Sequence, residues 1–549
     1  MRSGGKILVE ALLANGADFG YCVPGESYLD LLDALYDVRD AFSLIVCRHE
    51  GGAANMAEAY GKLTGRPGLA FVTRGPGATH ASIGVHTAMQ DATPMILLVG
   101  QIPREMMGRG AFQEVDFAAM FAPLAKWAAQ IESAARIPEF INRAYAVATS
   151  GRPGPVVLAI PEDVFEERSD APVAAPAPQG RAGVDAVTVR ALHDELAHAE
   201  RPLLIVGGGP WSATASHDLA QFAQANTLPV LVEFRCQDYL DNAHPSYVGE
   251  LGLGLDKTLA DRVRDADVVL ALGARLGDVV TDGYQLFHVP EPKQRLLLVS
   301  PDPDELGRVY RPAVGVAADP AAVIAALRAS PPIEEQRWAP ITAGMREEYR
   351  RRGAATPHVV RGVDLAAVVR ELRERLPRET IVTNGAGNYT VWVRRYFPFH
   401  EFGTQLAPRS GAMAYGLPAA IAAKLLHPDR PVVCFAGDGC FAMASSELAT
   451  AAMYNAAILV IVVNNGMYGT IRMHQERRFP HRVSGTDLAN PDFAALAQAC
   501  GAFGARVERT QEFAPVLEAA LASGRPALIE VIVDRHVLTP SFTLPEGAA

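Results

Sequence analysis

Short runs of consecutive apolar residues alternate with longer alanine-rich stretches along the whole chain. Apolar runs of about four to eight residues without polar positions are typical of parallel strands that are buried on both faces. The alanine-rich stretches between them have the length and composition of helices. This alternation predicts parallel α/β domains, in which helices connect the strands and cover the sheet.

The apolar runs fall into three groups, which predict three sheets in series. Strands are expected at residues 43–47, 68–72, 94–100 and 155–160, then at 203–206, 230–234, 268–272 and 295–299, and finally at 380–383, 432–436, 458–463 and 527–533. The fold class is therefore α/β, with three doubly wound parallel-sheet domains in series.

Two segments that lack this alternation predict linkers. Residues 168–185 are rich in Pro, Ala and Gly, and residues 331–358 are charged and interrupted by Pro, with some helix expected in the second segment. We therefore expect domains at residues 1–167, 186–330 and 359–549.

Composition and charge narrow the class of protein. The chain has 549 residues, a net charge of −11 and no long basic run, which argues against a nucleic-acid-binding protein. Its apolar runs are far shorter than the roughly 20 residues that cross a bilayer, and Met1–Glu10 is too polar for a secretory signal. The six cysteines form no C-x-x-C pair, which favours buried free thiols. We expect a soluble, cytoplasmic protein with neither a membrane nor a nucleic-acid partner.

The strongest chemical signal is a pair of motifs at two predicted strand ends. Gly437-Asp438-Gly439 follows the strand at 432–436, and Asn464-Asn465 follows the strand at 458–463, with a helix expected at 443–455 between them. Parallel strands end at the same edge of a sheet, so these groups should converge. Carboxylate and amide oxygens suit Mg²⁺, and glycines let an anion approach main-chain N–H groups. Each motif alone is more often a turn, but together they predict a site for Mg²⁺ and a diphosphate.

The same pair resembles the diphosphate and Mg²⁺ motif of thiamine-diphosphate enzymes. The resemblance implies that Asp438, Asn465 and the main-chain oxygen of Met467 hold the metal, and it extends over nearly the whole chain. It implies a pyrimidine-binding, a central Rossmann-like and a diphosphate-binding domain in series. The cofactor-binding residues that it implies in the third domain are Gly387, Asn388, Gly411, Met413, Gly437, Asp438, Gly439, Cys440, Asn465 and Met467.

Glu50 lies where a predicted strand passes into a helix that is expected from Ala53, within Arg48-His49-Glu50-Gly51-Gly52. By itself, such a glutamate is more often a first-turn residue that interacts with the helix dipole. The segment, however, resembles the family's pyrimidine-binding block. There the glutamate would hydrogen-bond N1′ of the aminopyrimidine ring, which makes Glu50 the first candidate for a catalytic residue.

Two further residues of the first domain are candidates for catalysis. His80 follows Gly75-Pro76-Gly77 in the first turn of a predicted helix, where a lone histidine is more often structural. Gln113 belongs to a segment that resembles the family's loop beside the reacting carbon, and it is a candidate for contacting the substrate.

The nearest resemblance is to the acetolactate synthase-like branch, in which the central domain binds FAD. Arg152 and Arg275 match positions associated with FAD, but the glycines 207–209 form an incomplete dinucleotide fingerprint, so FAD is left open. Two departures concern the substrate. Val279 stands where the branch has an arginine for the acceptor's carboxylate, and His474 stands where it has a tryptophan that selects larger acceptors.

The resemblance implies a carbon–carbon lyase or ligase that depends on thiamine diphosphate and Mg²⁺. It would decarboxylate a 2-keto acid such as pyruvate and pass the acyl unit to a proton or a second carbonyl. A 2-hydroxyacyl-CoA lyase, a flavin-dependent keto-acid oxidase and a catalytically silent regulatory paralogue stay open as alternatives. A homodimer or tetramer with its active site between subunits is expected, and a small regulatory subunit is left open.

Overall fold

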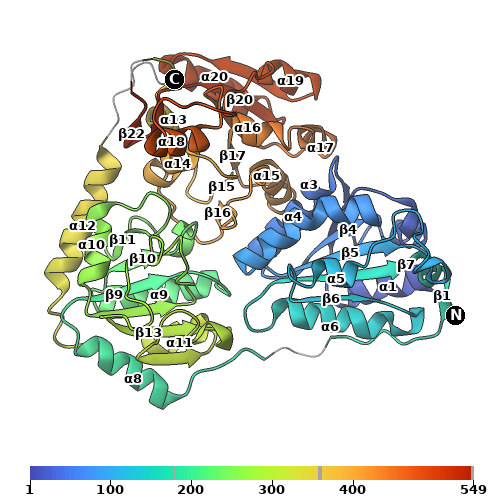
Figure 1. The fold of residues 1–549 in the computed structure, drawn as a ribbon, viewed down its shortest axis with the longest axis horizontal. Coiled ribbons are helices and arrows are strands. Elements are labelled where there is room, and N and C mark those ends of the chain that lie inside the picture. Colours follow the sequence, from blue (N-terminus) through green and yellow to red (C-terminus); the bar gives the residue numbers. More distant parts are fainter. Residues whose placement is uncertain (177–179, 356–360, 546–549) are drawn as a thin grey trace.

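The computed structural model describes residues 1–176, 180–355 and 361–545, and it contains three separate α/β units (Figure 1). Each unit is built on a sheet of six strands, and within each of these sheets all neighbouring strands are parallel. The predicted fold class is confirmed. The three units lie at the corners of a triangle, with the third unit in contact with both others (Figure 1).

The first domain precedes residue 170. In spatial order its sheet consists of β3 (Ser43–Val46), β2 (Phe19–Cys22), β4 (Gly68–Val72), β5 (Met95–Gln101), β7 (Pro155–Pro161) and β6 (Trp127–Gln130). Its helices are α1 (Gly4–Ala14), α2 (Leu29–Tyr36), α3 (Glu50–Thr64), α4 (Gly75–Asp91), α5 (Phe117–Phe121), α6 (Ile137–Thr149) and α7 (Glu162–Glu166). β1 (Arg2–Ser3) and β8 (Arg168–Ser169) pair antiparallel beside it.

The central domain has the strand order of a dinucleotide-binding fold. Its sheet consists of β11 (Tyr247–Glu250), β10 (Val230–Val232), β9 (Pro202–Val206), β12 (Val268–Leu272), β13 (Arg295–Ser300) and β14 (Val314–Ala317). Its helices are α8 (Ala186–Ala197), α9 (Ala213–Ala225), α10 (Lys257–Asp265), α11 (Pro320–Arg328) and α12 (Ala339–Ala354). Numbered within the domain, the order is 3-2-1-4-5-6.

The third domain repeats the strand order of the first. Its sheet consists of β16 (Gln405–Leu406), β15 (Ile381–Asn384), β17 (Val432–Gly437), β18 (Leu459–Asn464), β20 (Ala527–Ile532) and β19 (Phe503–Val507), and β21 (Val537–Thr539) and β22 (Phe542–Thr543) form a hairpin outside it. Its helices are α13 (Leu365–Arg375), α14 (Tyr389–Tyr396), α15 (Gly416–Leu426), α16 (Asp438–Ala442), α17 (Glu447–Met453), α18 (Gly469–Arg478), α19 (Phe493–Ala499) and α20 (Phe513–Ala522). Numbered within each domain, both orders are 2-1-3-4-6-5.

The predicted segmentation differs from the structure in three places. The second predicted linker, 331–358, contains α12, whose Met345 is buried in the central core, so most of this segment is part of a packed helix. Its last residues, 356–358, and the start of the domain expected at 359 lie outside the described residues, as do residues 177–179 of the first linker. The helix expected at 443–455 is the shorter α17, and the separate helix α16 ends just before this range. Helix α3 starts at Glu50 rather than at Ala53.

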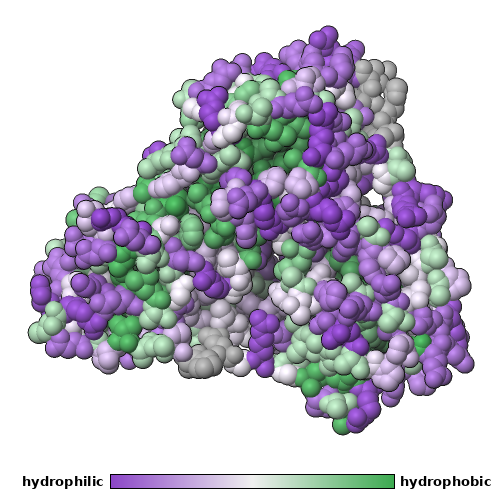
Figure 2. Space-filling view, turned by 180° about the vertical axis from the view of Figure 1, so that it is seen from behind, coloured by the Kyte–Doolittle hydropathy of each residue, from purple (hydrophilic) through white to green (hydrophobic). Residues whose placement is uncertain are grey.

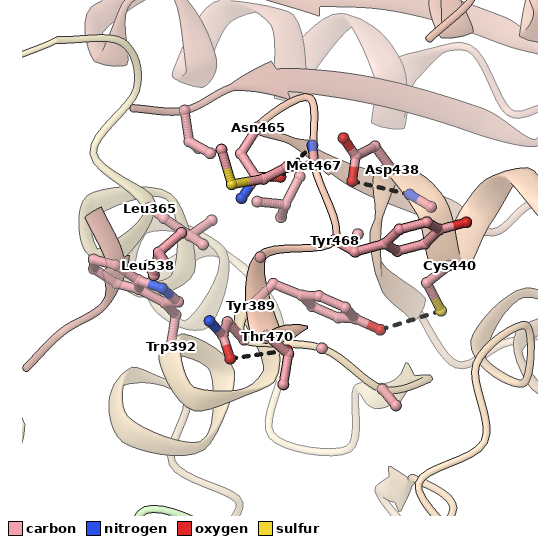
Figure 3. Close-up of a pocket in the computed structure, with 18 of the residues that line it drawn as sticks. Leu365, Tyr389, Trp392, Asp438, Cys440, Asn465, Met467, Tyr468, Thr470 and Leu538 are labelled. Atoms are coloured by element: carbon pink, nitrogen blue, oxygen red, sulfur yellow. Dashed lines mark hydrogen bonds between the residues drawn. The ribbon is translucent and has the colours of Figure 1, made fainter. Parts of the chain in front are cut away.

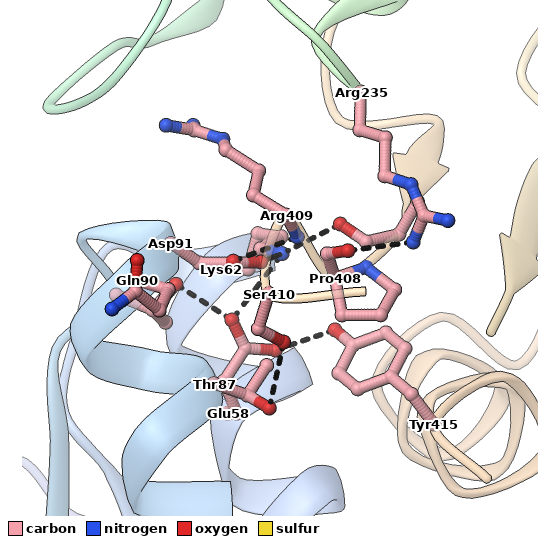
Figure 4. A network of polar contacts seen from close by, with 12 residues as sticks. Glu58, Lys62, Thr87, Gln90, Asp91, Arg235, Pro408, Arg409, Ser410 and Tyr415 are labelled. Atoms are coloured by element: carbon pink, nitrogen blue, oxygen red, sulfur yellow. Dashed lines mark hydrogen bonds and ion pairs between the residues drawn. The ribbon is translucent and has the colours of Figure 1, made fainter. Parts of the chain in front are cut away.

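The first and third domains share a buried interface in which α3 packs against α15. At its centre Lys62 forms ion pairs with Asp91 and, at 3.3 Å, with Glu58 (Figure 4). Glu58 also accepts hydrogen bonds from Thr93 at 2.7 Å and from the Tyr415 hydroxyl of the third domain. Each buried carboxylate therefore has a cation and at least one hydrogen-bond donor as partners.

The segment 407–411 joins this network to the central domain. Lys62 donates to the Ala407 carbonyl at 3.2 Å, and Arg235 of the central domain donates to the Pro408 carbonyl at 2.6 Å (Figure 4). The main-chain N–H of Arg409 donates to Asp91 at 2.8 Å, and its guanidinium donates to the Gly208 carbonyl at 3.0 Å. One short segment of the third domain thus contacts both other domains.

Within the described ranges, no helix combines the length and apolarity needed to cross a membrane. Apolar residues nevertheless gather on one face of the molecule, where the third domain approaches the first (Figure 2). Exposed large apolar side chains on helices or loops of these two domains include Ile83, Phe112, Met443, Met453 and Ile471.

Candidate active site

Each sheet has a switch point, where the strand order reverses. The loops that follow the two strands at this point run to opposite sides of the sheet and leave a crevice between them. In doubly wound sheets, ligands bind in the crevice at this point, beyond the carboxyl ends of the strands. In the third domain the switch point lies between β15 and β17, and the loops that follow these strands carry Gly387 and Asp438.

A cavity of about 270 Å³ opens at this switch point (Figure 3). All ten residues expected in this domain line it: Gly387, Asn388, Gly411, Met413, Gly437, Asp438, Gly439, Cys440, Asn465 and Met467. They come from the loops after β15, β17 and β18 and from the segment before α15. The described residues that line the cavity all lie between Val363 and Leu538, so this chain's first domain contributes none of them.

Asp438 is the electrostatic centre of the cavity. It is 3% exposed, and its Oδ1 accepts the N–H of Gly439 at 2.9 Å. Its Oδ2 accepts the N–H of Gly466 at 2.9 Å and the side-chain amide of Asn490 at 2.8 Å. Within the described residues, no Lys, Arg or His forms an ion pair with it. Burial outweighs the hydrogen bonds and raises the pKa of the Asp438 carboxyl. A bound cation would relieve this buried, uncompensated charge.

The other candidate metal ligands lie in the loop after β18. Asn465 accepts the N–H of Met467 at 3.2 Å through its side-chain oxygen, and the carbonyl of Met467 accepts the N–H of Gly469 at 2.9 Å. Asp438, Asn465 and Met467 together offer a carboxylate, an amide oxygen and a main-chain oxygen. This set of oxygen donors suits Mg²⁺.

Gly437 and Gly439 allow the main chain of the cavity wall to pack closely against two tyrosine rings. A Cβ on Gly439 would come within 2.5 Å of the Tyr468 ring, and a Cβ on Gly437 would come within 3.1 Å of the Tyr389 ring. Only glycine therefore fits these contacts without displacement. Cys440 accepts hydrogen bonds through its sulfur from the N–H of Ala414 at 3.3 Å and from the Tyr389 hydroxyl at 3.5 Å. Cys440 thereby ties the loop after β17 to the segment that contains Met413.

Asn490 is a site residue that the sequence did not predict. Its amide donates to Asp438 at 2.8 Å and to the side-chain oxygen of Asn464 at 3.0 Å. It lies in an irregular segment after α18 and follows no strand, so no pattern distinguishes it in the sequence. Leu488, in the same segment, donates its N–H to the Gly466 carbonyl at 2.9 Å and so holds the loop that carries the candidate ligands Asn465 and Met467.

Glu50, His80 and Gln113 come together at a different place, the start of α4. Glu50 begins α3, and its Oε2 lies 2.9 Å from Nδ1 of His80. The Gln113 carbonyl accepts the N–H of Gly75 at 3.2 Å, and its side chain accepts from Arg74 at 3.2 Å. Gln113 has a positive φ of 63°, a conformation that non-glycine residues rarely adopt.

Arg152 and Arg275 line a third place, a cavity of about 240 Å³ at the switch point of the central sheet. Val279 and two of the glycines that follow β9, Gly208 and Gly209, line the same cavity. Arg152 donates to the main-chain carbonyls of Met89 at 2.7 Å and Gln90 at 2.9 Å, which fixes it at the first domain. His474 is exposed on α18 and lines none of these cavities.

Three family models match the chain, one in each of its three domains. Residues 2–120 match the N-terminal thiamine pyrophosphate (TPP)-binding domain of thiamine pyrophosphate enzymes. Residues 189–327 match the central domain of these enzymes, and residues 385–531 match their C-terminal TPP-binding domain.

Whole-chain relatives agree with these matches. The chain is 34% identical to an acetolactate synthase large subunit of Parasynechococcus marenigrum, over 97% of this chain and 88% of that protein. It is 31% identical to the acetolactate synthase isozyme 2 large subunit of Escherichia coli, over 97% and 96% of the two chains. A probable acetolactate synthase large subunit of Methanocaldococcus jannaschii is 30% identical, over 99% and 93%.

Proposed function

The chain belongs to the acetolactate synthase large-subunit family of thiamine pyrophosphate enzymes, and from this premise we propose its reaction. It decarboxylates a 2-keto acid such as pyruvate and transfers the acyl unit to a second carbonyl or to a proton. Thiamine diphosphate, another name for thiamine pyrophosphate, and Mg²⁺ are its cofactors. The observation that carries the proposal is the cavity around Asp438, which all ten expected residues of the third domain line.

The third-domain cavity is the proposed site for the diphosphate and Mg²⁺. Asp438, Asn465 and the main-chain oxygen of Met467 would hold the metal, because they supply oxygen ligands and an uncompensated negative charge. Gly437 and Gly439 would let the diphosphate approach the main chain. When bound, thiamine diphosphate supplies a carbon nucleophile and an electron sink for decarboxylation. Met413, which is partly buried at the cavity wall, would position the middle of the cofactor.

Glu50 is proposed to hydrogen-bond the cofactor's pyrimidine ring and to hold and return a proton there. The cavity around Asp438 is lined by residues between Val363 and Leu538, and Glu50 is not one of them. We therefore propose that Glu50 of one subunit completes the cavity of a second copy, in a homodimer or in a tetramer of dimers. The apolar face near the first and third domains supports such a contact (Figure 2).

Several finer assignments stay proposals. Gln113 would contact the substrate from beside α4. Arg152 and Arg275 line the cavity where FAD would bind, and a flavin-dependent oxidase remains the second candidate function because their charges suit a diphosphate. The domain limits at 1–167, 186–330 and 359–549, with α12 added to the central domain, and a small regulatory subunit are likewise proposed. So is a cytoplasmic location, which the free, buried Cys22, Cys47, Cys236, Cys434 and Cys440 support.

The reaction is tested by incubating the purified chain with thiamine diphosphate, Mg²⁺ and pyruvate and identifying the products by chromatography. Acetolactate is the expected product, and it would show that Val279 and His474 are compatible with a keto-acid acceptor. Acetaldehyde would indicate transfer to a proton instead. If neither pyruvate nor any of a panel of other 2-keto acids is consumed, the proposal is wrong. A yellow protein that bleaches with substrate would favour the oxidase.

The role of Glu50 is tested by Glu50→Gln, which keeps the size of the side chain and removes its acid–base function. We expect turnover to fall at least about 100-fold, as is usual when an acid–base group is lost, while thiamine diphosphate stays bound. Glu139→Gln, on an exposed face of α6, serves as the matched control. Unchanged turnover in Glu50→Gln would refute the assignment.

A further inference from the structure

Glu50 has a neighbour that the proposed reaction does not explain. Nδ1 of His80 lies 2.9 Å from Oε2 of Glu50, although the two residues are on different helices. The Glu50 side chain is only 12% exposed, whereas that of His80 is 52% exposed. A half-exposed histidine whose Nδ1 contacts a nearly buried carboxylate can orient that carboxylate through a hydrogen bond.

The His80 ring is also restricted from a second side. The ring of His49 stacks on it, with centroids 4.6 Å apart and an angle of 26° between the planes. His49 is itself fixed, because its Nδ1 accepts the N–H of Gly51 at 3.0 Å. The His49 N–H in turn donates to Glu447 of the third domain at 3.0 Å. The orientation of the His80 ring thus depends on both the start of α3 and the third domain.

These contacts determine which nitrogen of each ring carries a proton. The bond to Glu50 requires a donor at Nδ1 of His80 when the carboxylate is ionised. His49 is an acceptor at Nδ1, so its own proton is on Nε2. Ligand atoms of His49, Glu50 and His80 lie within 4.8 Å of one another, as in a metal cluster. However, the Nδ1 atoms of both histidines already take part in hydrogen bonds. The three residues are therefore better described as a hydrogen-bonded Glu50–His80 pair with the His49 ring stacked on His80.

We propose that His80 is a positioning residue for Glu50: it donates its Nδ1–H to Oε2 and holds the carboxylate in one orientation, leaving Oε1 for the cofactor. Oε1 lies next to Gly77, where an added Cβ would be 3.5 Å from it, so the neighbour on this side carries no side chain that could cover the oxygen. Ionisable neighbours in this region include Arg48, His49 and Glu447, and Glu447 accepts the main-chain N–H groups of Arg48 and His49. This inference rests on the proposed role of Glu50.

The test uses three variants at one position in the full-length protein loaded with thiamine diphosphate and Mg²⁺. His80→Asn keeps an N–H donor close to the place of Nδ1, His80→Gln moves the donor outward to the place of Nε2, and His80→Ala removes it. The measurement is the rate at which the cofactor's thiazolium proton exchanges with deuterium, followed by NMR after acid quench. Loss of this proton is expected to depend on the hydrogen bond between Glu50 and the pyrimidine ring. The exchange rate therefore measures the proposed function of Glu50 and does not require that the substrate be known.

Hydrogen bonds to charged groups set the expected size of the effect. We expect His80→Ala and His80→Gln to slow exchange roughly 10- to 100-fold and His80→Asn to stay within about threefold of the wild type. His86→Ala, elsewhere on α4, is the matched control. Equal exchange in wild type and His80→Ala would overturn the proposal. It would also be overturned if His80→Asn were as slow as His80→Ala, because the Nδ1 donor would then not be the group that matters.

A second measurement needs no cofactor. In apo protein labelled with ¹⁵N-histidine, the chemical shifts should identify His80 as protonated at Nδ1, and Glu50→Gln should move that signal while that of His86 stays in place. A His80 protonated only at Nε2 would contradict the proposal. The two hypotheses fail separately. If Glu50→Gln leaves exchange unchanged, the proposed role of Glu50 is wrong, whereas rapid exchange in His80→Ala together with loss in Glu50→Gln refutes only the role of His80.

Discussion

Two groups of buried carboxylates in this chain have opposite surroundings. Glu58 and Asp91, between the first and third domains, share the ammonium group of Lys62. Asp438, in the third-domain cavity, accepts three hydrogen bonds but has no ion-pair partner among the described residues. Burial is similar, since the three residues are between 0% and 3% exposed. The comparison shows that burial alone does not mark a binding site. Asp438 differs from the paired acids because it combines burial and the lack of an ion-pair partner among the described residues with a place in a cavity wall.

The largest effect is expected from removing the uncompensated charge. Residues that only orient a metal ligand typically contribute roughly 10- to 100-fold to affinity, so Asp438→Ala should weaken Mg²⁺-dependent binding of thiamine diphosphate at least about 1,000-fold. The measurement is calorimetric titration with the cofactor at fixed Mg²⁺. Asp91→Asn, a change at a paired carboxylate, is the control and should leave this affinity unchanged. Equal cofactor retention in Asp438→Ala would refute the metal site.

Removing the shared cation should cost stability instead of affinity. Lys62→Met keeps the length of the side chain and leaves Glu58 and Asp91 as unpaired buried acids. We expect a loss of about 3 kcal/mol in the stability of the interface between the first and third domains, seen as a lower urea midpoint. Cofactor affinity, measured under native conditions, should change little. A variant as stable as the wild type would show that the network contributes nothing to docking.

A smaller effect is expected at Asn490, which touches Asp438 but is not a candidate ligand. Asn490→Ala removes the donors to Asp438 and Asn464 and should weaken Mg²⁺-dependent cofactor binding roughly 10- to 100-fold. Asn490→Asp would place a second carboxylate beside the first and should raise the apparent requirement for Mg²⁺. Calorimetry at several Mg²⁺ concentrations measures both changes. An effect as large as that of Asp438→Ala would mean that Asn490 is itself a ligand.

The smallest effect is a pH dependence of the paired region. Burial alone would lower the pKa of Lys62, but Asp91 and Glu58 outweigh it and raise the pKa above the ordinary value of 10.5. A raised lysine pKa contributes stability that is complete below the unfolded value and is lost as pH rises through the folded value. The difference in urea midpoint between wild type and Lys62→Met should therefore hold up to pH 10.5 and shrink above it. A difference that disappears below about pH 9 would contradict this.

The sequence predicted those parts of the structure that depend on local patterns. The twelve expected strands are all present, because continuous apolar runs have few alternatives to burial in a sheet. Strands such as β2 (Phe19–Cys22) and β6 (Trp127–Gln130) were missed, since glycine, alanine and glutamine interrupt the β-branched signal. The motifs after β17 and β18 were found because strand ends converge.

What the sequence did not predict arises from contacts between distant segments. Asn490 reaches Asp438 from an irregular loop, and His80 meets Glu50 from another helix, so neither distance can be derived from spacing. The pairing of Lys62 with Asp91 likewise depends on the packing of α3 against α4. Local patterns together with the family resemblance therefore named the candidate ligands, and only the folded chain distinguished paired from unpaired charges.

The segment 407–411 has a consequence for protein engineering. Ala407 and Arg409 bond to the first domain, Pro408 and the Arg409 guanidinium bond to the central domain, and Gly411 lines the cofactor cavity. A chimera in which the central domain is replaced by that of a relative must therefore keep central-domain groups that bond to this segment. This holds although the segment itself belongs to the third domain. Grafts that preserve Gly208 and Arg235 keep those contacts, and grafts that change them require compensating changes at residues 407–411.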